Sequence, residues 1–170
     1  MATILFITGG QRSGKSRYAM ELAQSLSPHP VYLATARPGD EDFRQRIERH
    51  RADRGEQWIT IEKPMHLDEL SFQESDVVVL DCLTLWLTNI FEHHQHHWQE
   101  ALAHARNEWD KFTSGNFTLI AVSNEVGMSI HPETAAGRKF IELQGFMNQH
   151  VAAMASAAWL MVAGINIKIK

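Results

Sequence analysis

Residues 9–16 read Gly9-Gly10-Gln11-Arg12-Ser13-Gly14-Lys15-Ser16 and complete the pattern G-x-x-x-x-G-K-S/T. An apolar, β-branched run at 4–8 precedes this stretch, and residues with helical spacing follow it as far as 26. A strand, a glycine-rich turn and a helix in this order are the context in which the pattern forms a phosphate-binding loop, or P-loop. Glycines let successive backbone N–H groups converge on phosphate oxygens, and the helix adds its positive N-terminal end. We therefore predict nucleotide binding here, rather than a glycine-rich turn that binds nothing.

Two side chains of this loop and one later carboxylate have predicted roles in the chemistry. Lys15 is expected to reach the β- and γ-phosphates, and Ser16 to offer its hydroxyl to Mg²⁺. A second Mg²⁺ contact is expected from a carboxylate at the end of a buried strand, and Asp81 directly follows the apolar run 77–80. The alternative for Asp81 is an N-cap of the helix predicted from 83, because aspartate is a favoured capping residue.

Apolar runs and segments with helical spacing alternate along all 170 residues. This order indicates an α/β protein, here a P-loop NTPase-type three-layer fold with a mostly parallel sheet and helices on both faces. After Gly164 the chain alternates apolar and polar residues, which indicates a C-terminal antiparallel edge hairpin. We expect residues 1–170 to form a single nucleotide-binding domain. Strands are predicted at 4–8, 31–34, 58–61, 77–80, 118–122, 159–162 and 165–170, and helices near 14–26, 40–53, 83–92, 97–113 and 134–157.

Composition narrows the expected partners and location. The net charge of −4 gives no global basic field, so nucleic acid is not expected as a partner. We expect no membrane insertion, because no apolar stretch approaches the roughly 20 residues that span a bilayer. Cys82 is the single cysteine, which excludes an intrachain disulfide and fits a reducing compartment. A cytoplasmic location is the expectation.

Residues 40–54 form a second candidate region, a predicted helix with an acidic start and a basic remainder. On helical spacing Phe43, Ile47 and His50 share one face, so the histidine lies on the apolar side. Such a histidine is more often packed into a core than catalytic, and the surrounding arginines could simply be solvated. Neutral imidazole nevertheless attacks phosphorus well near pH 7, and guanidinium groups would stabilise charge on phosphates. Spacing alone leaves both interpretations open. The arginines are Arg44, Arg46, Arg49, Arg51 and Arg54.

Several stretches together are similar to one protein family over nearly the whole chain. They are residues 8–17, 32–36, 46–54, 81–84, 123–127, 132–133 and 137–138, with Trp58, Glu62, Asn89 and Gly164. The sequence resembles the bifunctional adenosylcobinamide kinase / adenosylcobinamide-phosphate guanylyltransferases of adenosylcobalamin biosynthesis. The P-loop alone would indicate only a superfamily, whereas the arginine–histidine segment and the Ser-Asn-Glu-Val-Gly stretch at 123–127 are specific.

This resemblance implies two activities. In the first, ATP or GTP phosphorylates adenosylcobinamide. In the second, GMP passes from GTP through a guanylylated histidine, His50, to adenosylcobinamide phosphate, which is ping-pong chemistry. The catalytic residues would be His50 and Lys15, and the metal contacts Ser16 and Asp81. Nucleotide contacts beyond the P-loop are implied at Ala34, Thr35, Ala36, Arg51, Ala52, Asp53, Arg54, Glu62 and Thr84. The family also implies a homo-oligomer.

One departure concerns the position before His50, where some family members carry a second histidine and this chain has Arg49. We align the retained histidine with the nucleophile. If the other position were the carrier, the guanylyltransferase step would be lost and the kinase would remain. The rival interpretations are therefore another small-molecule P-loop kinase and, from a different class, a nucleotide-binding switch. The second lacks support because the Asn-Lys-x-Asp signature of regulatory GTPases is absent from the sequence.

Two further stretches carry open interpretations. Residues 123–127 follow a buried strand at the edge where open α/β sheets bind ligands, so they are expected either to bind substrate or to form loop structure. Residues 93–97 read His93-His94-Gln95-His96-His97. We interpret them as a solvated connector between two helices rather than a metal site, because no nearby cysteine or carboxylate pattern completes tetrahedral coordination.

Overall fold

The computed structural model describes residues 1–37, 55, 57–129 and 131–170. The helix predicted near 40–53, with His50 and its arginines, lies outside these residues. Among the helices that the structure describes, none has the length and apolar character needed to cross a bilayer.

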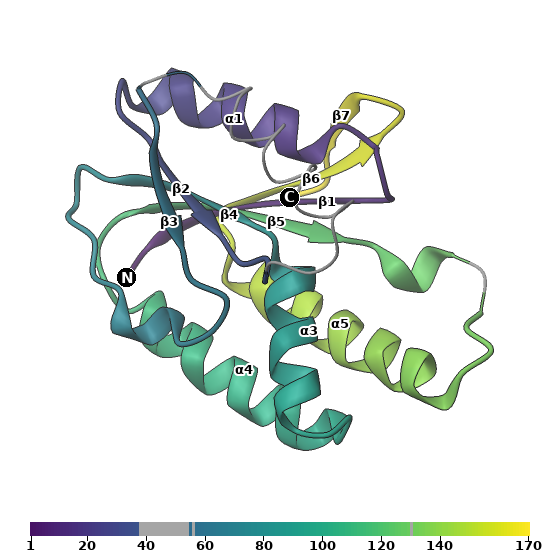
Figure 1. The fold of residues 1–170 in the computed structure, drawn as a ribbon. Coiled ribbons are helices and arrows are strands. Elements are labelled where there is room, and N and C mark those ends of the chain that lie inside the picture. Colours follow the sequence, from purple (N-terminus) through teal and green to yellow (C-terminus); the bar gives the residue numbers. More distant parts are fainter. Residues whose placement is uncertain (38–54, 56, 130) are drawn as a thin grey trace.

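A seven-stranded sheet in the order β3-β2-β4-β5-β1-β6-β7 forms the centre of the molecule (Figure 1). Every neighbouring pair is parallel except β6 and β7, which form the antiparallel hairpin predicted at the C-terminus. The mostly parallel sheet and the edge hairpin confirm the predicted fold class. The strands are β1 (Thr3–Gly9), β2 (Val31–Ala34), β3 (Ile59–Glu62), β4 (Val77–Asp81), β5 (Thr118–Asn124), β6 (Ala157–Val162) and β7 (Ile165–Lys168).

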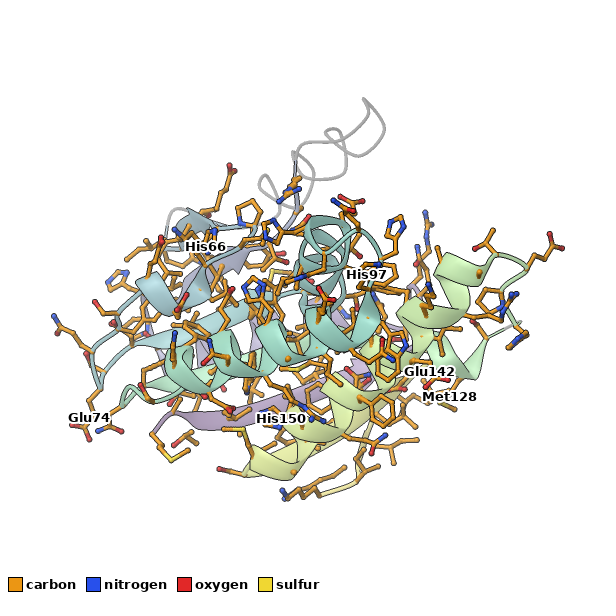
Figure 2. The ribbon with its side chains drawn as sticks, turned by 90° about the horizontal axis from the view of Figure 1, so that it is seen from below. His66, Glu74, His97, Met128, Glu142 and His150 are labelled. Carbon is orange, nitrogen blue, oxygen red and sulfur yellow. The ribbon has the colours of Figure 1, made fainter. Side chains whose placement is uncertain are left out.

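Helices cover both faces of this sheet. One face carries α1 (Lys15–Leu26), and the other carries α3 (Leu83–His93), α4 (Trp98–Phe112) and α5 (Ala135–Met154) (Figure 1). Figure 2 looks onto the second face, with α4 and α5 in front of the sheet. Two short 3₁₀ helices, η1 (Leu67–Glu69) and η2 (Val126–Met128), were not predicted from the sequence.

The apolar run of β4 shows why the sheet needs helices on both sides. Val78 and Leu80 belong to the core cluster under α3, α4 and α5, whereas Val77 and Val79 pack in the cluster that contains Ala19 of α1. Successive side chains of a strand point to opposite faces, so a continuous apolar run must be buried on both. The arrangement confirms the two-sided burial expected from the sequence.

Several predicted boundaries differ from those of the structure. The predicted helix 134–157 ends at Met154, and β6 already begins at Ala157. Ala157 pairs in register with Leu5 of β1, and this pairing overrides the helical preference of alanine. In addition, β3 begins at Ile59, because Trp58 packs edge-on against Tyr32 just before the strand, with ring centroids 6.2 Å apart.

Candidate functional site

The P-loop connects the end of β1 to the start of α1, and its glycines are required by close contacts. Gly9 has a φ of 154°, and a Cβ there would lie 2.5 Å from the carbonyl oxygen of Met161. Gly14 has a left-handed φ of 97° and is the N-cap residue of α1. The backbone N–H of Gly164, in the β6–β7 turn, donates to the Ser13 carbonyl at 2.9 Å. The C-terminal hairpin therefore supports the loop from outside.

Lys15 is held inside this loop. Its Nζ donates to the Gly10 carbonyl at 2.6 Å and to Ser13 Oγ at 3.5 Å, and the residue is buried. A buried ammonium surrounded by the loop's own oxygens is positioned to exchange these contacts for phosphate oxygens. The first turn of α1, which begins at Lys15, also contains Arg17 and no carboxylate, so its positive end is not neutralised locally.

The parallel strands bring several predicted site residues to one edge of the sheet. Ala34 ends β2, and in the register of the sheet it lies between Glu62 at the end of β3 and Asp81 at the end of β4. Gly9 ends β1 at the same edge, because β1, β5, β4 and β2 are all parallel. The predicted residues at 34, 62 and 81 thus share the carboxyl edge with the P-loop, where open α/β sheets bind ligands.

Asp81 is the last residue of β4, and Cys82 is the N-cap residue of α3. The structure therefore does not support the alternative that Asp81 caps this helix. Tyr32 donates its hydroxyl hydrogen to Asp81 Oδ2 at 2.8 Å. Because β5 lies between β4 and β1, the backbones of β4 and β1 are about 10 Å apart. The Ser16 hydroxyl and the Asp81 carboxylate are hard oxygen donors, so the residues present fit a Mg²⁺ ion with water among its ligands.

Thr35 is fully buried, and its hydroxyl and carbonyl groups form hydrogen bonds with other residues of the protein. Its Oγ1 donates to the Cys82 carbonyl at 2.7 Å and accepts from the Cys82 N–H at 2.9 Å. The Thr35 carbonyl accepts from Asn89 Nδ2 at 2.9 Å. These bonds join β2 to the start of α3 and fix the backbone beside Ala34 and Ala36. Thr35 therefore positions its neighbours at the edge of the sheet.

Thr84, in the first turn of α3, is joined to the end of β5. Its Oγ1 accepts from the backbone N–H of Asn124 at 3.0 Å and from Asn124 Nδ2 at 3.2 Å. Asn124 is the residue level with Gly9 in the β1–β5 register. The contact brings the predicted nucleotide-binding threonine close to the strand that neighbours the P-loop.

A hydrogen-bond network behind the P-loop was not predicted from the sequence. Glu125 Oε1 accepts from Thr8 Oγ1 at 2.5 Å and from Asn148 Nδ2 at 3.1 Å, and its backbone N–H donates to the Gly9 carbonyl at 3.0 Å. Ser123 is buried and donates to Asn148 Oδ1 at 2.6 Å. Gln144 completes the network with bonds to Ser123 and Asn148. Residues 123–125 therefore shape the site by fastening α5 and β5 to the end of β1.

The available sequence signal for this network was weak. Gln144 and Asn148 are a polar pair at helical spacing within the buried face of α5. Such a pair indicates that partners must exist, because buried polar groups are hydrogen-bonded. The pair does not indicate which strand supplies them.

The remaining predicted residues, His50, Arg51, Ala52, Asp53 and Arg54, lie outside the described part of the chain. They stay predictions.

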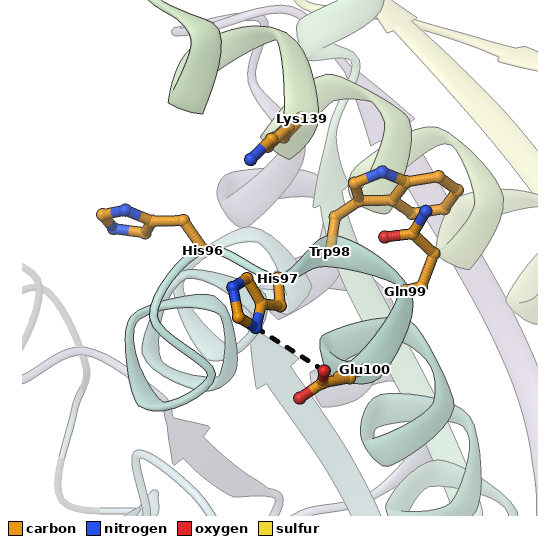
Figure 3. Close-up of a pocket in the computed structure, with 6 residues that line it drawn as sticks. All are labelled: His96, His97, Trp98, Gln99, Glu100 and Lys139. Atoms are coloured by element: carbon orange, nitrogen blue, oxygen red, sulfur yellow. Dashed lines mark ion pairs between the residues drawn. The ribbon is translucent and has the colours of Figure 1, made fainter.

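A shallow pocket of about 410 Å³ opens elsewhere, on the face covered by α4 and α5 (Figure 3). Two of the residues that line it form an ion pair, with His97 Nδ1 3.5 Å from Glu100 Oε1. None of the predicted nucleotide-binding residues lines it, so we do not assign it to the nucleotide. The lining residues are His96, His97, Trp98, Gln99, Glu100 and Lys139.

The connector that precedes α4 is less solvated than predicted. His94 is half-buried, and its Nε2 lies 2.9 Å from Nδ1 of His104 in α4. This contact depends on a histidine ten residues further on, which the local pattern at 93–97 could not reveal. The expectation of a wholly solvated connector was therefore wrong for His94.

Known proteins resemble this chain over nearly its full length. The chain is 38% identical to the bifunctional adenosylcobalamin biosynthesis protein CobU of Escherichia coli, over 98% of this chain and 99% of the relative. It is 34% identical to CobP of Pseudomonas aeruginosa, which carries the same description, over 96% of this chain and 95% of the relative.

Two solved structures share the fold at low sequence identity. The flagellar accessory protein FlaH of Methanocaldococcus jannaschii aligns with a TM-score of 0.51 at 14% identity, over 99% of this chain and 78% of that one. An ATPase of a bacterial type III secretion system aligns with a TM-score of 0.57 at 8% identity, over 98% of this chain and 56% of that one.

A family match covers nearly the whole chain. Residues 5–169 match the family described as cobinamide kinase / cobinamide phosphate guanyltransferase. This match and the identities above confirm the resemblance found in the sequence. The chain, with its P-loop between β1 and α1, belongs to the cobinamide kinase / cobinamide phosphate guanyltransferase family.

Proposed function

We propose that this chain phosphorylates adenosylcobinamide with ATP or GTP and then transfers GMP from GTP to adenosylcobinamide phosphate, giving adenosylcobinamide-GDP. The observation that carries the proposal is a complete P-loop with a buried Lys15, in a chain that matches the family from residue 5 to residue 169. Both activities use the phosphates of a nucleotide, so one phosphate-binding loop can serve both.

In the kinase step, the hydroxyl oxygen of the cobinamide side chain attacks the γ-phosphorus and loses its proton to water. The bond from the γ-phosphorus to the bridging oxygen breaks, and the nucleoside diphosphate leaves. Lys15 and the backbone N–H groups of residues 9–16 bind the phosphates and stabilise the charge that develops on them. Ser16 and Asp81 would hold Mg²⁺, which neutralises phosphate charge when bound. The Tyr32 hydroxyl donates a hydrogen bond that holds the Asp81 carboxylate in place.

In the guanylyl transfer step, the neutral imidazole of His50 attacks the α-phosphorus of GTP. A P–N bond forms and the bond to the leaving pyrophosphate breaks. A phosphate oxygen of adenosylcobinamide phosphate then attacks the same phosphorus and releases the imidazole. We assign nucleotide contacts to residues 34–36, 51–54, Glu62 and Thr84. Support comes from the position of Ala34, Glu62 and Thr84 at or beside the edge that carries the P-loop.

We also propose a homo-oligomer in the cytoplasm. Apolar side chains are exposed on the C-terminal hairpin, where Val162, Ile165 and Ile167 are between 47% and 67% exposed. This edge of the sheet offers both apolar surface and unpaired strand groups, which favour association between copies. Sedimentation velocity of the purified chain tests the proposal, and a single monomeric species at micromolar concentration would contradict it.

The function is tested by incubating the purified protein with adenosylcobinamide, Mg²⁺ and either ATP or GTP, and separating the corrinoids by chromatography with mass detection. We expect adenosylcobinamide phosphate with a competent phosphoryl donor, and adenosylcobinamide-GDP when GTP is present. Phosphate ester without the GDP product would favour the rival P-loop kinase. Absence of both products would contradict the proposal and revive the nucleotide-binding switch.

A further inference from the structure

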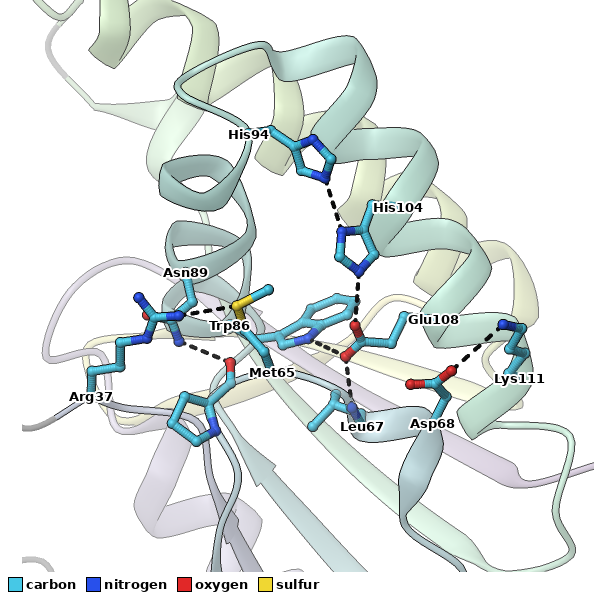
Figure 4. Close-up of polar contacts among 11 residues, drawn as sticks. Arg37, Met65, Leu67, Asp68, Trp86, Asn89, His94, His104, Glu108 and Lys111 are labelled. Carbon is cyan, nitrogen blue, oxygen red and sulfur yellow. Dashed lines mark hydrogen bonds and ion pairs between the residues drawn. The ribbon is translucent and has the colours of Figure 1, made fainter.

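A buried carboxylate joins α4 to η1 on the face of the sheet opposite α1. Glu108 of α4 is only 2% exposed. Its Oε1 accepts two hydrogen bonds, from the Leu67 N–H at 2.7 Å and from Trp86 Nε1 at 2.9 Å (Figure 4). One oxygen of this carboxylate is therefore satisfied by neutral donors from two other elements.

The second oxygen of Glu108 has a different environment. Oε2 is buried and receives no hydrogen bond from the described residues. His104 Nε2 lies 3.2 Å away. A buried carboxylate oxygen without a donor is costly, and a bound cation would compensate it.

Two further donors converge on Glu108. His66 and Asp68 flank Leu67, whose N–H is bonded to Glu108, so the bond that fastens η1 to α4 also brings both side chains to the carboxylate. One ligand atom from each of His66, Asp68 and Glu108 lies within 4.8 Å of the other two. His66 and Asp68 are exposed, which leaves one side of the cluster open to solvent.

We propose that His66, Asp68 and Glu108 form a binding site for a divalent transition-metal ion of the Zn²⁺ type. One imidazole and two carboxylates are donors that Zn²⁺ accepts, and three protein ligands leave a position for water. Mg²⁺ and Ca²⁺ prefer oxygen-only coordination, so the imidazole favours the softer ion. The ion would fasten η1 to α4, and the site is separate from the residues assigned to the nucleotide.

One cation already neighbours the cluster. Lys111 Nζ lies 3.6 Å from Asp68 Oδ2, and the lysine side chain is 59% exposed (Figure 4). Such an exposed pair contributes little to stability, so the lysine can swing away when an ion binds Asp68.

The histidines around the α3–α4 connector are the competing metal ligands. The rings of His93, His94 and His104 have centroids 5.1 to 6.1 Å apart. Among the described residues, however, the set whose donor atoms converge within 4.8 Å is His66, Asp68 and Glu108. The experiment must therefore separate the two groups of histidines.

Zn²⁺ titration of the full chain without a histidine tag, by calorimetry, tests the site, with Co²⁺ absorption as a second readout of coordination. We expect one ion bound per chain in the wild type. His66→Ala and Asp68→Asn change exposed side chains, so the fold should persist, and each should weaken binding at least about tenfold. His93→Ala is the matched control, because His93 is exposed and belongs to the competing group of histidines; it should bind as the wild type does.

Three results would overturn the proposal. They are no Zn²⁺ binding by the wild type, unchanged affinity in both His66→Ala and Asp68→Asn, or an equal loss in His93→Ala that assigns binding to the histidines around the α3–α4 connector. A Zn²⁺-dependent rise in melting temperature that is present in the wild type and absent in His66→Ala would add support, since an ion bound only to the folded chain stabilises it.

Discussion

The hydroxyl of Tyr32 on β2 donates to Oδ2 of Asp81 at the end of β4, over 2.8 Å. The bond fixes one oxygen of the carboxylate that we propose as a Mg²⁺ ligand. We predict that Asp81→Asn lowers the phosphoryl transfer rate by about 10²-fold or more and raises the Mg²⁺ concentration needed for half-maximal rate. Tyr32→Phe keeps the carboxylate and should cost less than about tenfold. Kinase rates measured against Mg²⁺ concentration check both, and equal effects of the two variants would contradict the assignment.

Lys15 offers the most direct test of the phosphate loop. Replacing it by alanine removes the buried ammonium that contacts Gly10 and Ser13, and with it the charge assigned to the β- and γ-phosphates. We expect a loss of about 10³-fold or more in phosphoryl transfer, with weaker nucleotide binding. Lys139→Ala, an exposed lysine on α5, is the control and should retain wild-type rates. The idea fails if Lys15→Ala, shown to be folded by circular dichroism, keeps its activity.

The two glycines that open the loop should respond differently to alanine. A Cβ at Gly9 would meet the Met161 carbonyl at 2.5 Å, whereas a Cβ at Gly10 has no atom within 4 Å among the described residues. Gly9→Ala must therefore shift the backbone, and we predict a loss of about 1–3 kcal/mol in the free energy of unfolding. Gly10→Ala should change it by less than about 0.5 kcal/mol. Urea unfolding without nucleotide measures both, and equal stability of the two variants would refute the close contact.

Cys82 should be unreactive in the folded chain. Burial, reinforced by the charge of Asp81, raises the pKa of its thiol to about 12 from the ordinary value of 9.0. The nucleophilic thiolate is therefore scarce below pH 9, and alkylation or disulfide exchange should proceed only after unfolding. Because the folded pKa is the higher one, the stability this thiol contributes is fully present below pH 9 and is lost as the pH rises from 9 toward 12. Rapid reaction with a thiol reagent in native buffer, compared with urea, would show this account to be wrong.

The sequence predicted those features whose signal is local. Residues 9–16 identified the loop because the motif is contiguous, and the run 77–80 identified a strand buried on both faces because its four residues are all apolar. The run 77–80 also pointed to Asp81 at the end of that strand, whereas Ala34 and Glu62 came from the family resemblance, and the register of the parallel strands places all three at one edge.

Contacts between distant residues could not be predicted in the same way. Glu125 and Asn148 are 23 positions apart in the sequence, and no local pattern pairs them. His94 meets His104 only because α3 and α4 pack side by side. Similarly, the alanines before Trp159 favour a helix by themselves, and only pairing with β1 makes them a strand.

The central claim, that His50 carries GMP, is tested most directly by incubating the purified chain with α-³²P-labelled GTP and Mg²⁺ and then denaturing it. The account predicts protein-bound label that survives base and is released by acid, as a phosphoramidate would be, and that is lost in His50→Ala but retained in His97→Ala. Label that persists in His50→Ala, or no label in the wild type, would contradict it.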